Sequence, residues 1–118
     1  MVDNTVDGVP SDLEDPLIID VRESGEDGVV LTLRGELDPH TAPRLRERID
    51  EAFASDRVQM ALDLAGVTFI DSSGLRVILS GHKEANERGG KLVLQSPSPT
   101  ARRLLDITGL LDHIDVDG

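Results

Sequence analysis

The 118-residue sequence contains no cysteine, tryptophan or tyrosine and only two phenylalanines. Without cysteine the chain can form neither a disulfide framework nor a zinc site with cysteine ligands. The scarcity of aromatic side chains also removes the platforms on which single-stranded nucleic acids stack. The interior is therefore expected to consist of leucine, isoleucine, valine and alanine.

Basic residues are also scarce, because 12 lysines and arginines stand against 23 aspartates and glutamates, a formal net charge of −11. Such a surface repels nucleic-acid phosphates and anionic lipid headgroups, so neither nucleic acid nor membrane is expected as a partner. The sequence lacks the run of about 18 apolar residues that a membrane-spanning helix needs, and it shows no signal peptide. We therefore expect a soluble, cytoplasmic protein.

The first fifteen residues are acidic and contain few apolar side chains. Such a segment cannot bury enough surface to offset the entropy that it would lose on ordering. We therefore predict a disordered acidic tail over residues 1–15 and one domain over residues 16–118.

Within this domain, the spacing of apolar residues alternates between period two, typical of strands, and a period of three to four, typical of helices. The pattern predicts an α/β fold in which helices pack against a four- or five-stranded mixed sheet. The predicted strands cover residues 17–21, 29–33, 58–64 and 92–94, and the predicted helices cover 41–53, 73–88 and 101–108.

The sequence also predicts three details of the helices and of the C-terminal segment. Thr41 is expected to be the N-cap of the first helix. The last apolar residues, 110–116, fit either a helix or a strand packed on the core. The buried face of the second helix is predicted to comprise Leu75, Ile78, Leu79, His82 and Ala85.

Signals of catalysis are missing from the sequence. Its histidines, His40, His82 and His113, are far apart and show no metal-ligand spacing with a carboxylate. The pair Gly89-Gly90 follows a helix, whereas the glycines of a nucleotide-binding turn precede one. No serine or threonine is tied by sequence to a histidine base. We therefore expect no enzymatic activity, no cofactor and no metal site.

The most informative stretch runs from Val67 to Leu75 and places Asp71, Ser72, Ser73 and Gly74 at the start of a helix. Taken alone, this stretch is typical of a helix cap, which stabilises a helix by about 1 kcal/mol.

Three segments, in this order along the chain, indicate that the stretch also has a function beyond capping. Residues 35–43 contain Gly-Glu-Leu-Asp and Thr-Ala-Pro, residues 69–75 read Phe-Ile-Asp-Ser-Ser-Gly-Leu, and residues 106–111 read Asp-Ile-Thr-Gly-Leu-Leu. Together they resemble anti-sigma-factor antagonists of the STAS-domain family, over roughly residues 17–116. One position departs from that pattern, since Arg76 stands where many members have glycine.

The resemblance implies a binding protein without an active site. Its unphosphorylated form would bind a cytoplasmic anti-sigma factor that is also a serine kinase, and so release the sigma factor. The kinase would then phosphorylate Ser72 and end the complex, and a phosphoserine phosphatase would reset the protein. Nothing in the sequence demands more than a monomer. The expected partner-binding residues are Asp38, Asp71, Ser73, Gly74, Leu75 and Arg76.

The switch also has a physical rationale. Backbone N–H groups and the helix dipole can hold a phosphate on Ser72, and inside an interface its charge is repelled by Asp71. A penalty of about 3 kcal/mol weakens binding roughly a hundredfold. Arg76 lies four positions after Ser72, so we hypothesise that it pairs with phosphoserine 72. A solvated Arg76, or one that contacts the partner, is the alternative.

Two other functions remain open from the sequence. A STAS-type accessory subunit of a membrane transporter, or a signalling scaffold, would share the fold without being phosphorylated. A small hydrolase or nucleotide-binding enzyme would need a convergent polar pocket, which the sequence does not reveal.

Overall fold

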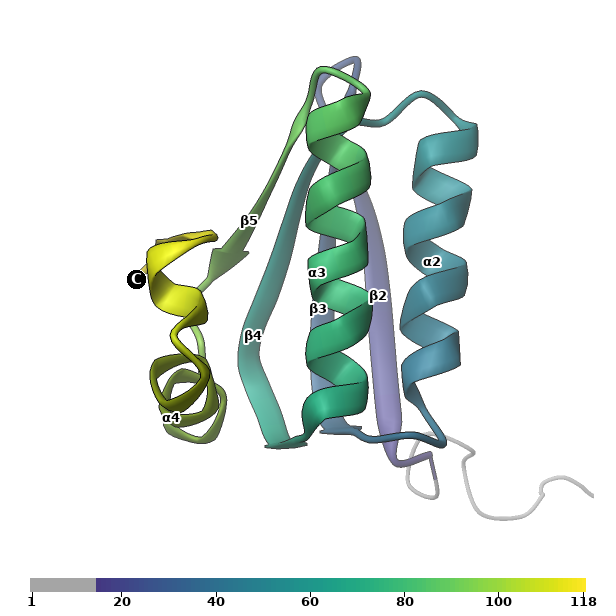
Figure 1. Cartoon of the computed structure of the whole chain (residues 1–118). Coiled ribbons are helices and arrows are strands. Elements are labelled where there is room, and N and C mark those ends of the chain that lie inside the picture. The colour runs from purple at the N-terminus through teal and green to yellow at the C-terminus, as the bar shows by residue number, and fades with distance from the viewer. Residues whose placement is uncertain (1–14) are drawn as a thin grey trace, which may run out of the picture.

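The computed structural model describes residues 15–118, which form a five-stranded sheet with helices against it (Figure 1). The predicted α/β fold with a mixed sheet is thus confirmed. The predicted tail lies outside the described residues, except for Asp15. In chain order the elements are β2 (Leu17–Ser24), β3 (Gly28–Leu37), α2 (Ala42–Ala54), β4 (Gln59–Ile70), α3 (Ser72–Glu87), β5 (Lys91–Gln95), α4 (Pro99–Thr108), the 3-10 helix η1 (Leu110–Asp112) and β6 (Asp115–Asp117).

The sheet has the strand order β2-β3-β4-β5-β6. The first two predicted strands, β2 and β3, form an antiparallel hairpin, whose turn contains Gly25 at φ +65°. The remaining neighbours are parallel, because α2 carries the chain from β3 back to the start of β4, and α3 does the same between β4 and β5. In Figure 1 both helices lie side by side on one face of the sheet.

The core lies between that face and the two helices. Alternate residues of the strands, such as Leu31 and Leu62, are fully buried there, as are Leu45 and Ile49 of α2. The predicted buried face of α3 is wrong at two positions, since Leu79 is 37% exposed and His82 is only half-buried. Gly81 is buried instead.

Gly81 takes this place because α3 packs closely against β5 and α2 there. A Cβ at this position would meet the terminal Cδ1 atoms of Leu92 and Ile49 at 3.2 and 3.3 Å. A larger residue would hold the helix away from the sheet.

β4 is longer than predicted and runs through Gly66 to Ile70, a segment expected to be a connection. The period-two pattern fails in this half, since the buried residues Leu64, Val67 and Ile70 are three positions apart. The cause is a pair of register irregularities against β3, between Thr32 and Arg34 and between Gly35 and Glu36. β3 likewise continues to Leu37 instead of ending before Gly35.

The C-terminal segment contains both a helical turn and a strand. α4 ends at Gly109, which has a φ of +78° and so lies in the left-handed region that glycine adopts readily. After η1, β6 pairs with β5 and Ile114 is buried in the core. α4 packs against β4, whose pairing with β5 stops at Asp63. Within residues 15–118, no helix has both the length and the apolar character to span a membrane.

Candidate functional site

The predicted site lies where the two central strands end. Leu37 of β3 and Ile70 of β4 are register partners, so Asp38 and Asp71, which directly follow them, stand at the same edge of the sheet. The Asp71 N–H donates to the Leu37 carbonyl at 3.2 Å and holds the two chain segments together. Two strand-to-helix junctions, β3–α2 and β4–α3, therefore lie next to each other.

At the β4–α3 junction, Asp71 is the N-cap of α3. Its backbone is extended, and its carboxylate accepts hydrogen bonds from the N–H groups of Ser73, at 2.8 Å, and Gly74, at 3.4 Å. The Asp71 carbonyl accepts the first helical bond, from Leu75 N–H at 3.1 Å. The helix therefore begins at Ser72, one residue before the predicted start.

Ser72 occupies the first helical position and is exposed. Within residues 15–118 its hydroxyl makes no hydrogen bond, because Asp71 performs the capping that the sequence pattern indicated. Ser73, the second serine, is half-buried. The more accessible hydroxyl at this junction is therefore that of Ser72.

Gly74 and Leu75 were predicted to contact a partner, but both are buried. Leu75 is 5% exposed and packs in the core. A Cβ on Gly74 would lie 2.6 Å from Cγ of Leu37, so the absence of a side chain allows α3 to pack closely on the end of β3. In this structure the two residues position the junction and offer little surface to a partner.

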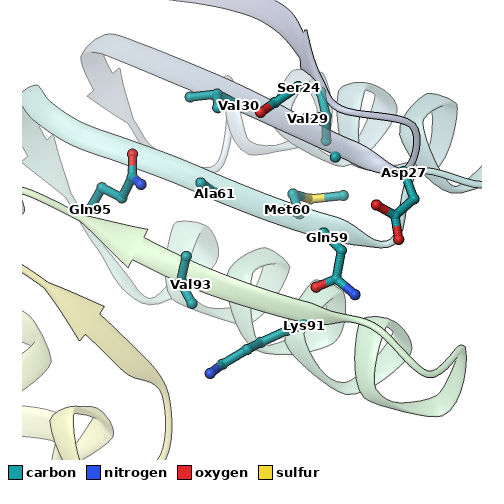
Figure 2. A pocket seen from close by; sticks show the side chains of 11 residues that line it. Ser24, Asp27, Val29, Val30, Gln59, Met60, Ala61, Lys91, Val93 and Gln95 are labelled. Carbon is teal, nitrogen blue, oxygen red and sulfur yellow. The ribbon is translucent and has the colours of Figure 1, made fainter.

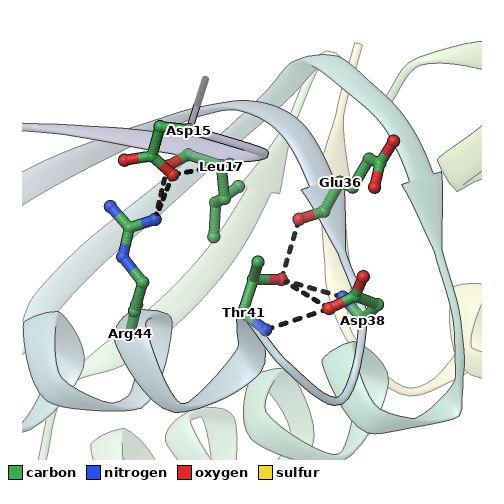
Figure 3. Close-up of polar contacts among 6 residues, drawn as sticks. All are labelled: Asp15, Leu17, Glu36, Asp38, Thr41 and Arg44. Atoms are coloured by element: carbon green, nitrogen blue, oxygen red, sulfur yellow. Dashed lines mark hydrogen bonds and ion pairs between the residues drawn. The ribbon is translucent and has the colours of Figure 1, made fainter. Parts of the chain in front are cut away.

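The β3–α2 junction is held by a compact set of hydrogen bonds around Asp38 and Thr41 (Figure 3). The Asp38 carboxylate accepts from the N–H groups of Thr41 and His40, both at 2.9 Å. The Thr41 hydroxyl donates to the Glu36 carbonyl at 2.8 Å and accepts from the Asp38 N–H at 2.9 Å. The hydrogen bond from Thr41 N–H, supported by that from His40, lowers the pKa of the Asp38 carboxyl.

The prediction that Thr41 caps α2 needs a correction. Thr41 does stand at the N-cap position, but its side chain makes no capping hydrogen bond. The Asp38 carbonyl accepts from the Ala42 N–H at 2.8 Å instead. Thr41 is 1% exposed and its hydroxyl is fully engaged inside the loop.

Arg44 fixes the first turn of α2 to the start of β2, as Figure 3 also shows. Its guanidinium donates to the Leu17 carbonyl at 2.7 Å and pairs with the Asp15 carboxylate. This ion pair lowers the pKa of Asp15. The β3–α2 junction is thus stabilised both by the hydrogen bonds within its loop and by the contacts of Arg44 with the start of β2.

Arg76 lies one helical turn after Ser72 and is exposed. Within the described residues it forms no ion pair. It lines a hollow of about 310 Å³ between α2 and α3, together with Arg46, Val77 and Ser80. Arg46 is held there by a hydrogen bond to the Ser80 hydroxyl, at 2.8 Å.

Phe69 belongs to this edge of the sheet and was not predicted as a site residue. It is 46% exposed, two positions before Asp71 and opposite Glu36 in the register. The sequence offered one signal, a large aromatic side chain in a chain with very few. The signal was missed because the segment was interpreted as a connection and not as a strand with an outer face.

A second hollow, of about 300 Å³, lies at the opposite edge of the sheet, where the parallel strands begin (Figure 2). Val30, Ala61 and Val93 form its apolar floor, and Asp27 and Lys91 are its charged lining residues. Residues 15–118 contain no group of histidine and acidic side chains arranged to hold a metal ion. None of the predicted site residues lines this hollow.

Comparison with known proteins places these features in a family. A model of the STAS domain matches residues 19–117. The anti-sigma-B factor antagonist of Bacillus subtilis is 36% identical over 98 residues, which cover 83% of this chain and 88% of that protein. The anti-sigma F factor antagonist of Paenibacillus polymyxa is 40% identical over 83 residues, covering 70% of this chain and 71% of that one.

Solved structures agree with the sequence comparison. The anti-sigma factor antagonist SpoIIAA in its unphosphorylated form matches with a TM-score of 0.74 and 28% identity, over 84% of this chain and 87% of that chain. The Bacillus SpoIIAA in its phosphorylated form matches with a TM-score of 0.70 at the same 28% identity, over 86% and 91%.

Proposed function

The chain belongs to the STAS domain family, and from this premise we propose that it is an anti-sigma-factor antagonist switched by phosphorylation of Ser72. Unphosphorylated, it binds an anti-sigma factor and so releases the sigma factor. Phosphorylated, it lets the anti-sigma factor go. The relatives named as antagonists of anti-sigma factors, each at least 36% identical, support the partner class.

One observation carries the choice of Ser72. Its side chain is exposed at the first position of α3, and no hydrogen bond engages its hydroxyl within residues 15–118. A kinase can therefore reach the hydroxyl without unfolding the helix. The hydroxyl of Thr41, at the neighbouring junction, is buried and doubly hydrogen-bonded.

The docking surface surrounds this hydroxyl. Asp71 and Ser73 flank Ser72, and Asp38 lies at the adjacent strand end. Phe69 adds an exposed aromatic side chain, of the kind that is enriched at the centre of protein interfaces. We assign Arg76 to the margin of this surface, one turn along α3.

The partner is itself the kinase in this proposal. In the complex, the Ser72 oxygen forms a bond to the γ-phosphorus of bound ATP as the bond to the bridging oxygen of ADP breaks. The hydroxyl proton passes to a base of the kinase. A separate phosphatase hydrolyses the phosphoserine and restores the binding form. The chain itself supplies only the acceptor and its surroundings, and it works in the cytoplasm.

The new phosphate ends the complex by electrostatics. It adds about −1.5 to −2 charges beside the Asp71 carboxylate, inside an interface from which water is excluded. Because Asp71 already occupies the N–H groups of Ser73 and Gly74, the helix terminus cannot offer all its donors to the phosphate. A penalty of about 3 kcal/mol weakens binding roughly a hundredfold.

The switch needs no refolding. Both the phosphorylated and the unphosphorylated form of SpoIIAA match this fold, with TM-scores of 0.70 and 0.74. In this proposal the change that ends binding is local charge at one exposed position.

A STAS-type accessory subunit of a transporter, or a scaffold, is the alternative function. It would use the same sheet edge without needing an acceptor hydroxyl. Ser72 would then be replaceable by either alanine or aspartate with equal binding.

The experiment captures partners from host-cell lysate on immobilised wild type, Ser72→Ala and Ser72→Asp, with Ser73→Asp as the matched charge control. We expect wild type and Ser72→Ala to retain an anti-sigma factor with an ATPase fold, identified by mass spectrometry, and Ser72→Asp to lose it. Ser73→Asp should retain more than Ser72→Asp. Equal capture of a transporter or scaffold by every bait would reject the proposal.

A further inference from the structure

We propose that Arg76 forms an ion pair with phosphoserine 72, so that this chain stabilises its own phosphorylated form through a side chain on the next turn of α3. The inference rests on the proposed function for its biological meaning. Its physical content, an interaction between two named groups, can be tested in the isolated protein.

The N-terminus of α3 has few free N–H donors for the phosphate. Asp71 engages the N–H groups of Ser73 and Gly74, and the Leu75 N–H bonds the Asp71 carbonyl. Within residues 15–118, the N–H of Ser72 is the one donor of the first turn that has no such partner. Because the Asp71 carboxylate adds negative charge, the phosphate requires a cation from elsewhere.

Arg76 is positioned to supply this cation. α3 begins at Ser72, so the two residues are an i, i+4 pair within one regular helix. Long side chains of a helix lean toward its N-terminus, so Arg76, which lines the hollow beside Ser80, can turn its guanidinium toward Ser72 when a phosphate is present. The acidic group lies N-terminal to the basic one, the favourable order for such a pair. A guanidinium can also bind phosphate with two parallel hydrogen bonds.

Arg76 is also available for this pairing. Within residues 15–118 most of the arginines have a carboxylate partner, as Arg46 has with Asp50 at 3.8 Å and Arg88 with Glu84 at 3.0 Å. Arg76 has none. Three other arginines of the described residues also lack a side-chain carboxylate partner, but Arg76 is the one that lies a helical turn from Ser72.

A second guanidinium contributes to the positive electrostatic potential on this side of α3. Arg46 of α2 lines the hollow that Arg76 also lines, and the Ser80 hydroxyl and Asp50 hold it there. Arg46 raises the positive potential along this side of α3 without competing for the place of Arg76. We therefore expect Arg76 to contribute most to the phosphate and Arg46 less.

The consequence of this ion pair is a switch that favours the phosphorylated form. A bound guanidinium neutralises part of the phosphate's charge and covers some of its oxygens, which slows attack by a phosphatase. The phosphorylated form then lasts longer than it would with glycine at position 76.

The test measures the second pKa of the phosphate by phosphorus NMR, in full-length protein with phosphoserine placed at position 72 by genetic-code expansion. The ordinary value is about 6, and a nearby cation lowers it by favouring the dianion. Arg76→Gln keeps a polar side chain of similar helix propensity while removing its charge, and should raise this pKa by about 0.4 units. Arg76→Lys should restore most of the difference.

Arg103→Gln, at an exposed arginine of α4, is the matched control and should leave the phosphate pKa unchanged. The effect of Arg76→Gln should shrink in high salt, as expected for an exposed pair. An unchanged pKa in Arg76→Gln would overturn the pairing. A larger rise in Arg46→Gln than in Arg76→Gln would also overturn it, by assigning the phosphate to α2.

This experiment needs neither kinase nor anti-sigma factor. Its failure would therefore leave the capture experiment of the proposed function untouched. Conversely, the expected rise of the phosphate pKa in Arg76→Gln, combined with equal capture by all baits, would reject the proposed function and support the ion pair.

Discussion

The two strand-to-helix junctions at the end of the sheet use the same residue types with opposite results. Each places an aspartate directly after a central strand and a hydroxyl residue near the start of a helix. At β3–α2 the Thr41 hydroxyl is 1% exposed and bonds Glu36 and Asp38. At β4–α3 the Ser72 hydroxyl is exposed, and Asp71 alone caps the helix.

The difference arises from the length of the connection. Three residues separate Asp38 from α2, so the chain folds back and encloses Thr41. Asp71 leads straight into α3, and Ser72 points out on the first turn. A serine or threonine beside a capping aspartate is thus a structural residue when the loop encloses it and an available acceptor when the helix exposes it.

The largest effect on stability is expected from Thr41→Val. The substitution keeps the shape of the side chain but leaves the Glu36 carbonyl without its donor and the Asp38 N–H without its acceptor. Urea denaturation should show a loss of about 2 kcal/mol. Ser72→Ala should change stability by less than about 0.5 kcal/mol, as at an ordinary surface site. Equal losses would remove the contrast between the junctions.

Gly74→Ala should follow, because its Cβ would meet the buried Leu37 at 2.6 Å. Overpacking of this kind costs about 1–3 kcal/mol, of which about 1 kcal/mol is offset by the higher helix propensity of alanine. Gly81→Ala on the same helix is the matched control, since its nearest contacts are flexible side-chain ends at 3.2 and 3.3 Å. Both substitutions gain the same helix propensity. If Gly74→Ala were as stable as Gly81→Ala, close packing at this junction would not explain the glycine.

Asp71→Ala is expected to cost about 1 kcal/mol, the usual value of an N-cap. Asp71→Asn keeps a side-chain oxygen that accepts hydrogen bonds and should lose less. The measurement is again urea denaturation, with helix content followed by circular dichroism. A cost in Asp71→Asn equal to that in Asp71→Ala would show that charge, and not capping geometry, is what the junction needs.

The smallest effect is a pH dependence at the first junction. The folded pKa of Asp38 lies below its unfolded value of about 3.9, because Thr41 and His40 donate to the ionised carboxylate. Its stabilising contribution is therefore complete above the unfolded pKa and is lost as the pH falls through the folded pKa. The amide NMR shifts of His40 and Thr41 should report this titration below pH 4, and Asp38→Asn should abolish it.

The sequence predicted the order of strands and helices because its apolar periodicity changes cleanly between elements. It also located the start of α3 to within one residue, since Asp-Ser-Ser-Gly is a strong capping signal. It could not predict the second half of β4, where irregular pairing with β3 moves the buried positions from Leu64 to Val67 and Ile70.

The sequence could indicate which candidate residues lie near one another, but it could not predict which of them are exposed. The resemblance to STAS-domain antagonists implied that Asp38 and Asp71 lie on one surface, and the register places them at neighbouring strand ends. That Leu75 is buried, that Phe69 is exposed and that Asp71 occupies two N–H groups depend on how α3 packs against β3. Such three-dimensional contacts are not encoded in the spacing of one segment.

The central claim is that Ser72, and not its neighbours, is the acceptor. The direct test adds ATP to the complex captured on wild-type protein and maps phosphate by tandem mass spectrometry of tryptic peptides, with Ser72→Ala in parallel. We expect one phosphate within residues 58–76, located on Ser72, and none in Ser72→Ala. Phosphate on Ser73 or on Thr41, undiminished labelling of Ser72→Ala, or no phosphorylation at all would contradict it.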